Sequence, residues 1–240
     1  MAFETQRRGY SVSAGQSAAD IDAGLRTYML RVYNYMASAL ALTGIVALAA
    51  ASSPAFMQAV FGSGLSWVVM LAPFALVLVL SFGIHKMSMP AAQAVFWAYA
   101  ALMGLSLSSI FLVYTGESIA RTFFITAGTF GAMSLYGYTT KKDLSGWGSF
   151  LFMGLIGLII ASVVNIFLGS TMLQFVISAA GVLIFTGLTA YDTQRIKESY
   201  WEGDDTTTAG KKAIFGALQL YLDFINLFIM LLRFFGNARN

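Results

Sequence analysis

The run QLYLDFINLF (residues 219–228) places a carboxylate, Asp223, inside an apolar stretch that ends only at Arg233. A charged side chain at the centre of a membrane helix costs about 2.5–3.5 kcal/mol on insertion scales. Such side chains face the interior of a helix bundle or a water-filled cavity, and they mark functional sites by default. The stretch therefore predicts a helix packed inside a membrane bundle, with Asp223 as a candidate functional residue.

The composition is that of a membrane protein. Of the 240 residues, 58% are hydrophobic and only 10% are charged, and the mean hydropathy is +0.73. A soluble domain carries about 25% charged residues. The chain has no cysteine and one histidine, His85, which excludes disulfides, thiol catalysis and metal clusters built from cysteine or histidine. The net charge of +3 indicates an asymmetry of charge across a bilayer rather than a nucleic-acid partner.

Seven apolar segments each approach the roughly 20 residues that span a bilayer. They are 29–51, 65–84, 91–114, 120–139, 147–168, 171–191 and 213–235. The first resembles a signal-peptide core, but about 35 residues precede it, which favours a membrane span. Residues 1–25 are predicted to be a disordered cytoplasmic tail, and residues 26–240 a seven-helix transmembrane domain. The fold prediction is an all-α membrane protein whose only long connection is 192–212. Two glycine pairs are predicted to lie where helices pack closely: Gly128/Gly131 and Gly154/Gly157.

Basic residues alternate between the two sides of this arrangement. Of the 14 lysines and arginines, only Arg121, Arg233 and Arg239 are assigned to the side that the chain reaches after the third, fifth and seventh segments. The others lie before or at the start of the first segment, or after the second, fourth and sixth. Since basic residues favour the cytoplasmic side, the N-terminus is predicted to be cytoplasmic and the C-terminus to lie outside.

The last segment carries a polar stripe. Gln219, Asp223 and Asn226 are spaced i, i+4 and i+7, so they share one helix face, and Arg233 continues it two turns later. Two interpretations stay open. The stripe is a functional seam, or it is a set of hydrogen-bonding groups that only hold helices together.

A second carboxylate, Asp192, lies in TAYDTQRIKESY (189–200), one turn after Thr189. It is the first charged residue after a run that is uncharged from Leu144 onward. The sixth and seventh segments run antiparallel, and Asp223 lies about 15 Å from the cytoplasmic end of its segment at 1.5 Å per residue. The two carboxylates could therefore meet, although Asp192 alone would be an ordinary interfacial residue. Paired carboxylates share a proton and form a proton switch, and when ionised they attract Ca²⁺. Lys86 is a candidate counter-charge, with ordinary loop charge as the alternative.

Four stretches resemble the Bax inhibitor-1 family, also called the transmembrane BAX-inhibitor-motif family. They are TKKDL (140–144), NIFL (165–168), YDTQRIK (191–197) and LYLDFINLFIMLLRFFG (220–236). The resemblance covers residues 26–236 and is to bacterial members. It implies a bundle of seven helices with the seventh at its centre, in the cytoplasmic (inner) membrane.

The resemblance also implies a function, a pH-sensitive leak of Ca²⁺ gated by an aspartate pair. Those aspartates correspond to Asp192 and Asp223, which would be both the pH sensor and the metal-contacting groups. Ca²⁺ is the transported ion, no cofactor is implied, and membrane lipid surrounds the bundle. A family arginine that latches onto the pair corresponds by spacing to Lys86, which keeps the charge but loses the bidentate geometry of arginine. Gln219, Asn226, Arg233 and Thr189 are predicted to support the pair.

Other functions are weighed against the channel. The alternative is a non-conducting regulatory protein, because some bacterial relatives are linked to a membrane protease, and residues 1–25 would then bind the protease or another membrane partner. An enzyme is disfavoured because Tyr191-Asp192 has no GxGD motif to complete an intramembrane aspartic protease. A retinal protein would need a buried lysine in the last segment, where only Lys211 and Lys212 occur, at its cytoplasmic end.

Overall fold

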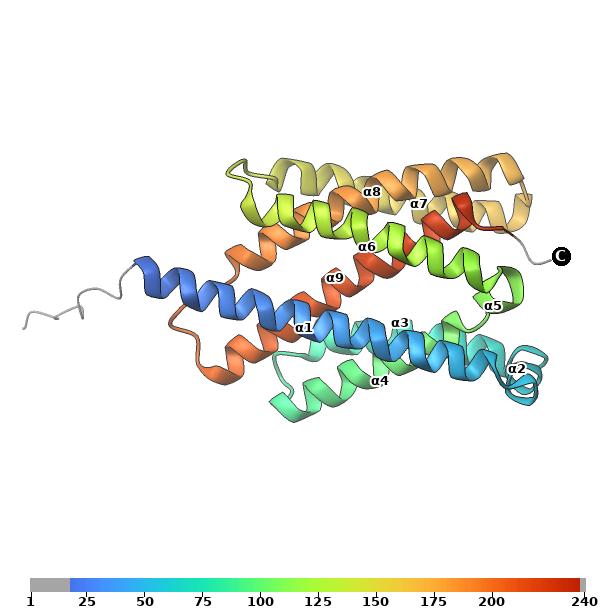
Figure 1. The fold of residues 1–240 in the computed structure, drawn as a ribbon, viewed down its shortest axis with the longest axis horizontal. Helices are drawn as coiled ribbons and strands as arrows, with labels where there is room; N and C mark the ends of the chain where they lie inside the picture. The colour runs from blue at the N-terminus through green and yellow to red at the C-terminus, as the bar shows by residue number, and fades with distance from the viewer. Residues whose placement is uncertain (1–17, 238–240) are drawn as a thin grey trace, which may run out of the picture.

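A computed structural model of the protein describes residues 18–237, which form nine helices joined by turns and short loops. They are α1 (Ala18–Ala51), α2 (Pro54–Phe61), α3 (Leu65–Gly83), α4 (Met89–Leu107), α5 (Ile110–Val113), α6 (Gly116–Thr139), α7 (Ser145–Leu168), α8 (Thr171–Glu198) and α9 (Thr206–Phe235). The long helices run lengthwise through one bundle (Figure 1). The all-α prediction is confirmed, and α1 begins inside the segment predicted as a tail, whose residues 1–17 lie outside the described range.

Six helical segments are long and apolar enough to cross a membrane: α1, α3, α4 together with α5, α7, α8 and α9. The exception among the long helices is α6, although it has 24 residues. Four of its hydroxyl side chains are buried, and several of its large apolar side chains, such as Phe124 and Leu135, are exposed. The buried polar residues of α6 are Ser118, Thr122, Thr126 and Ser134. They lower the hydropathy of α6 without exposing polar groups.

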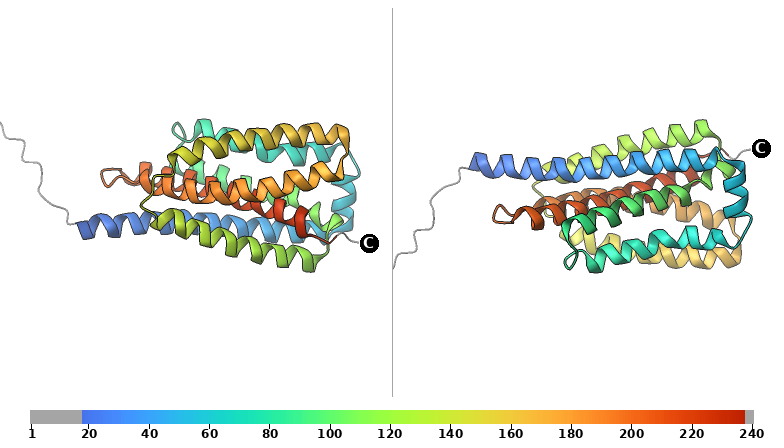
Figure 2. Two further views of the ribbon diagram at one scale, coloured as in Figure 1. Left: turned by 90° about the horizontal axis from the view of Figure 1, so that it is seen from above. Right: turned by 90° about the horizontal axis from the view of Figure 1, so that it is seen from below.

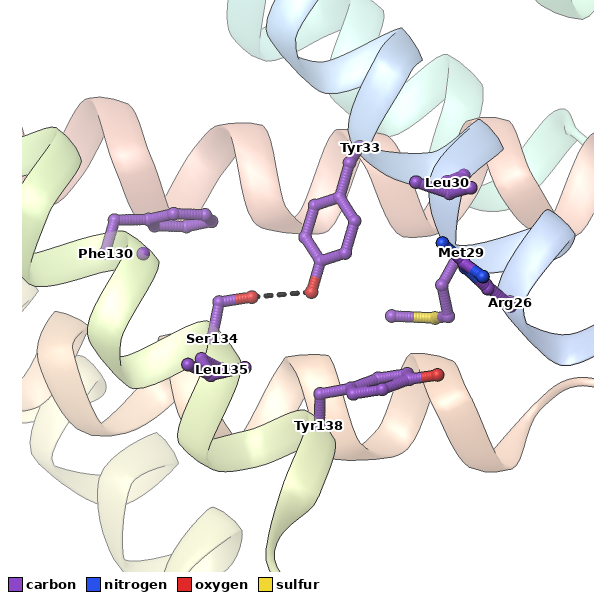
Figure 3. Close-up of a pocket in the computed structure, with 9 residues that line it drawn as sticks. Arg26, Met29, Leu30, Tyr33, Phe130, Ser134, Leu135 and Tyr138 are labelled. Carbon is purple, nitrogen blue, oxygen red and sulfur yellow. Dashed lines mark hydrogen bonds between the residues drawn. The ribbon is translucent and has the colours of Figure 1, made fainter. Parts of the chain in front are cut away.

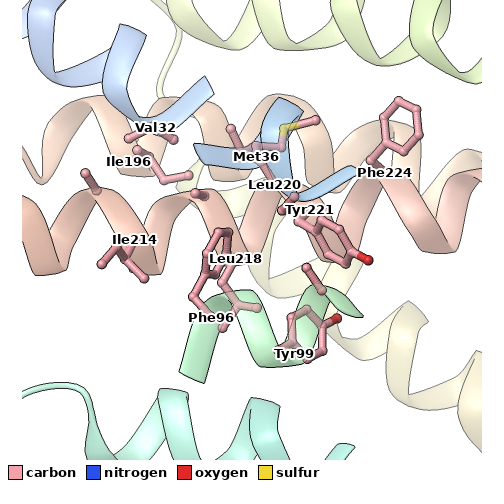
Figure 4. Close-up of a cluster of buried hydrophobic side chains, with 14 of the residues drawn as sticks. Val32, Met36, Phe96, Tyr99, Ile196, Ile214, Leu218, Leu220, Tyr221 and Phe224 are labelled. Atoms are coloured by element: carbon pink, nitrogen blue, oxygen red, sulfur yellow. The ribbon is translucent and has the colours of Figure 1, made fainter. Parts of the chain in front are cut away.

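Helix α9 is the centre of the bundle. It packs against α1, α4, α6 and α8, and both further views show it enclosed by the other helices (Figure 2). In its most apolar 18-residue stretch 72% of the residues are buried, against 11–28% in the other five candidate spans. Around it lies the main hydrophobic core, in which Leu218 and Tyr221 of α9 meet Val32 of α1 and Phe96 of α4 (Figure 4).

The connection between α8 and α9 is shorter than predicted. The prediction of a long loop over 192–212 is wrong, because α8 continues to Glu198 and α9 begins at Thr206. Asp205 caps α9 by accepting hydrogen bonds from the backbone N–H groups of Thr207 and Thr208, at 2.7 and 2.9 Å. Charged residues at a helix end remain helical once the end is capped, so hydropathy marked only the apolar part of each helix.

Only one of the four glycines predicted at close helix contacts lies at one. A Cβ added to Gly128, Gly131 or Gly157 would meet no atom within 4 Å, whereas a Cβ added to Gly154 would lie 3.1 Å from the Ile184 side chain. The closest approach of α6 and α8 is instead at Gly137. The division between the fifth and sixth segments is confirmed at Gly169, which ends α7 with a φ of 60°.

The turns gather at two ends of the bundle. The start of α1 and the α3–α4, α6–α7 and α8–α9 connections lie at one end (Figure 1). At the opposite end lie α2, α5, the α7–α8 turn and the end of α9. Most lysines and arginines of the described range therefore lie at the first end.

Candidate functional site: a carboxyl pair in a lateral crevice

A cavity of about 870 Å³ lies between α3, α7, α8 and α9, and we call it the carboxyl crevice. Phe74 of α3 and several apolar side chains of α7 form one wall. The other wall comes from α8 and α9 and carries the charged and amide side chains, which are Asp192, Arg195, Gln219, Asp223 and Asn226. The polar stripe of the last helix thus faces a cavity.

The structure brings Asp192 and Asp223 together. Their side chains lie within hydrogen-bonding range of each other. Asp223 is only 5% exposed, and its Oδ2 has no hydrogen-bond partner in the described part of the chain. Since a carboxylate only accepts hydrogen bonds, a bond between two carboxyls requires one of them to carry a proton and donate it. Two carboxyls placed in this way can share one proton.

The cation that faces this pair is Arg195. It lines the same cavity and interacts electrostatically with Asp192. Lys86, the candidate from the sequence, is exposed in the α3–α4 turn and is not among the residues that line the cavity. Arg195 was not singled out from the sequence, but its i+3 spacing from Asp192 is the signal for a side-chain pair on one helix face.

The stripe continues toward the other end of the bundle. Arg233 lines a second cavity of about 210 Å³ together with Asn165 and Gln174. Ser162 and Ile166 line both cavities, so the two spaces adjoin. The two adjoining cavities therefore carry polar side chains of α7, α8 and α9 from the carboxyl pair to the exposed Arg233.

Thr189 does not belong to the stripe. It is fully buried in α8, where its hydroxyl donates to the carbonyl of Phe185 at 2.8 Å. Its own carbonyl accepts a hydrogen bond of 2.7 Å from Thr193, whose hydroxyl shares one of 3.0 Å with Ser134 of α6. Ser134 in turn shares one of 2.7 Å with Tyr33 of α1. Sequence analysis missed this network, since its members lie on three helices distant in the chain.

Comparison with known sequences gives the family. The sequence profile of the family described as inhibitor of apoptosis-promoting Bax1 matches residues 25–240. The chain belongs to this Bax inhibitor-1 family. It is 54% identical over 220 residues to inner membrane protein YbhL of Escherichia coli strain K12, covering 90% of this chain and 94% of YbhL. It is 50% identical over 244 residues to an uncharacterized protein of Caulobacter vibrioides, covering 97% and 98% of the two chains.

This Bax inhibitor-1 family member is accordingly a multi-pass protein of the bacterial inner membrane. The family resemblance read from the four sequence stretches is confirmed. A more distant relative is an uncharacterized membrane protein of Streptococcus pyogenes, 46% identical over 154 residues, or 64% of this chain and 67% of the relative.

The metal-binding capacity of the site is limited to the carboxyl pair. No group of three or more histidine, aspartate or glutamate side chains forms within residues 18–237. Ca²⁺ takes six to eight oxygen ligands, so two carboxyls would leave most positions to water or to neutral oxygens such as those of Gln219 and Asn226. The pair is suited to brief contact with a cation rather than to tight storage.

Two other carboxylates accept hydrogen bonds beside helix starts at the basic end. Hydrogen bonds from Ser145 lower the pKa of Asp143, and hydrogen bonds from Thr208 and Thr207 lower that of Asp205. Both are fully exposed and lie outside the cavity. They offer controls for effects that depend on the carboxyl pair itself.

Proposed function

We propose that this protein is a pH-sensitive calcium leak channel of the inner membrane, gated by Asp192 and Asp223. The observation that carries the proposal is the contact of these two carboxyls at the wall of a large crevice. A buried pair that only held helices together would not need a cavity of about 870 Å³ beside it. The adjoining second cavity extends the polar wall as far as Arg233.

In this proposal α6 is a seventh span, the N-terminus is cytoplasmic and the C-terminus lies outside. Supporting it, α6 buries four of its hydroxyls and exposes several large apolar side chains, such as Phe124 and Leu135. The same orientation is favoured by the basic residues at the end of the bundle where α1 begins (Figure 1). The carboxyl pair then lies toward the cytoplasmic side of the crevice, and Arg233 lies in the adjoining cavity toward the outer side.

The proton controls the contact between α8 and α9. With one shared proton, the pair links the two helices by a hydrogen bond. When both carboxyls are ionised they repel each other, and Arg195 or an entering Ca²⁺ becomes the stabilising partner. Ion passage is therefore tied to the protonation state of the pair. No catalytic step is proposed.

The test is Ca²⁺ entry into dye-loaded liposomes that contain the purified protein, measured between pH 5 and pH 8. We expect a pH-dependent flux in the parent. Asp223→Asn should give one constant flux, equal to that of the parent at pH 5, because an asparagine amide donates to Asp192 at every pH. Asp143→Asn changes a fully exposed carboxyl outside the cavity and should leave the pH response intact.

Two charge variants distinguish the counter-charges. If Arg195 stabilises the ionised pair, Arg195→Gln should shift the pH response while Lys86→Gln leaves it unchanged. The opposite result would assign the role to Lys86, as the family resemblance implies, and would require α3 to move. An absence of flux at every pH in the parent would contradict the channel and favour a non-conducting regulatory protein that binds a membrane protease or another membrane partner.

A further inference from the structure

A third cavity, separate from the carboxyl crevice and from the small cavity at Arg233, lies between α1 and α6 (Figure 3). Its volume is about 620 Å³, within the range of about 300–1,000 Å³ typical of small-molecule sites. Two turns of each helix line it. The residues are Arg26, Met29, Leu30, Tyr33, Phe130, Gly131, Ser134, Leu135 and Tyr138. We call this cavity the α1–α6 groove.

The groove exists because α1 and α6 both pack on α9 and α8 but make few contacts with each other. Gly131 contributes no side chain to the space, and nothing lies within 4 Å of where its Cβ would be. Leu30 and Leu135 at the rims are 52% and 63% exposed. The groove therefore opens sideways from the bundle, toward the lipid.

The floor of the groove is suited to hydrocarbon. Met29 and Phe130 are buried there. The only polar groups at the floor are the hydroxyls of Tyr33 and Ser134, which bond to each other at 2.7 Å (Figure 3). Because these hydroxyls are already paired, an apolar occupant would leave no polar group without a partner.

The mouth of the groove is basic. Arg26 is exposed, and within the described residues no carboxylate lies in ion-pairing range of it. Lys197 adds a second positive charge beside Tyr138. Its Nζ donates to the Tyr138 carbonyl at 2.8 Å and lies 5.6 Å from the centre of the ring. One end of the groove thus attracts an anion, while the rest is apolar.

We propose that the α1–α6 groove binds an anionic phospholipid, with an acyl chain along Tyr33 and Phe130 and the phosphate at Arg26. A guanidinium matches a phosphate through two parallel hydrogen bonds, and basic pockets between membrane helices bind lipid headgroups. From Arg26 to Tyr33 the groove spans about 10 Å at 1.5 Å per residue. That length accepts part of one acyl chain but is too short to seat a transmembrane helix of a partner. The proposal is independent of ion conduction.

Native mass spectrometry of the full chain in detergent, with added phosphatidylglycerol or phosphatidylcholine, tests the groove. The key variant is Gly131→Leu, which fills the space, and its matched control is Gly128→Leu. Gly128 lies on the same helix, and a Cβ there also meets nothing within 4 Å, but it does not line the groove. We expect Gly131→Leu to retain one phosphatidylglycerol fewer than the parent and Gly128→Leu. Equal retention in all three would overturn the proposal.

The headgroup contact is tested by Arg26→Gln against Arg31→Gln, an exposed arginine of the same helix outside the groove. Loss of one charge-assisted contact should lower the preference for phosphatidylglycerol over phosphatidylcholine by about tenfold in Arg26→Gln only. An equal preference in both variants would contradict the phosphate site. If the parent is a dimer that Gly131→Leu converts to a monomer, the groove is an interface between copies and the lipid proposal is wrong.

Discussion

The closest approach of α6 and α8, at Gly137, makes the packing of these helices open to a direct test. In Gly137→Ala the added Cβ would lie 2.9 Å from both the Cα and the carbonyl carbon of Ala190, and closer still to its carbonyl oxygen. Ordinary contact begins at 3.4 Å, so backbone must move away from backbone by at least 0.5 Å. Overpacking of this kind costs about 1–3 kcal/mol.

The matched control is Gly128→Ala on the same helix, where a Cβ meets nothing within 4 Å. Both variants gain the same helix propensity, about 1 kcal/mol, so their difference isolates the overpacking cost. At about 2–4 °C per kcal/mol for a chain of this size, Gly137→Ala should unfold about 2–12 °C below Gly128→Ala. Tryptophan fluorescence during heating in detergent measures both midpoints. If the two variants unfold at the same temperature, Gly137 of α6 does not lie against the backbone of Ala190 of α8.

Three smaller predictions concern single polar side chains. Tyr221→Phe should cost about 0.5–1.5 kcal/mol, because the Tyr221 hydroxyl shares a hydrogen bond of 2.7 Å with Thr43. Tyr99→Phe should be neutral or stabilising, because the buried Tyr99 hydroxyl has no partner among the described residues; equal losses in the two variants during thermal unfolding would contradict this contrast. The hydrogen bonds from Thr208 hold the pKa of Asp205 below its ordinary value, so the capping contribution is complete above that ordinary value and is lost as the pH falls through the lowered one. Protection of the amides in the first turn of α9, measured relative to their intrinsic exchange rate at each pH, should therefore fall in acid, and Asp205→Asn, which caps without a charge, should remove that pH dependence of the protection.

Most of the fold could be predicted from the sequence because the bilayer imposes a length and an apolar composition on each span. The helix ends could not. The segments at 192–198 and 206–212 carry charges that hydropathy assigns to a loop, yet they extend α8 and α9 beyond the apolar region. Nothing in the local sequence marks that extension except the cap at Asp205. The short helix α2 was missed for a related reason, since eight residues are too few to register as a span.

The carboxyl pair could be predicted, but its surroundings could not. Asp223 is conspicuous in an apolar run, and the antiparallel order of the last two spans brings Asp192 near it. The choice of Arg195 over Lys86 depends on how far each helix is rotated about its axis and how far α3 lies from α8. Those quantities come from side-chain packing across the bundle, and one sequence does not specify them.

The polar side chains of α6 explain both its low hydropathy and the fixed position of α8. In a bilayer a buried hydroxyl gains most from a partner inside the protein, and among the described residues the buried Thr122 hydroxyl of α6 has none. Ser134 finds two, Tyr33 of α1 and Thr193 of α8. Thr193 directly follows Asp192, so the face of α8 that turns toward α6 is held by hydrogen bonds, as well as by close contact at Gly137. The opposite face borders the crevice, where α3 and α7 leave space. A change in the protonation of the carboxyl pair is therefore expected to move α9, α3 or α7 relative to α8, while α1, α6 and α8 stay together.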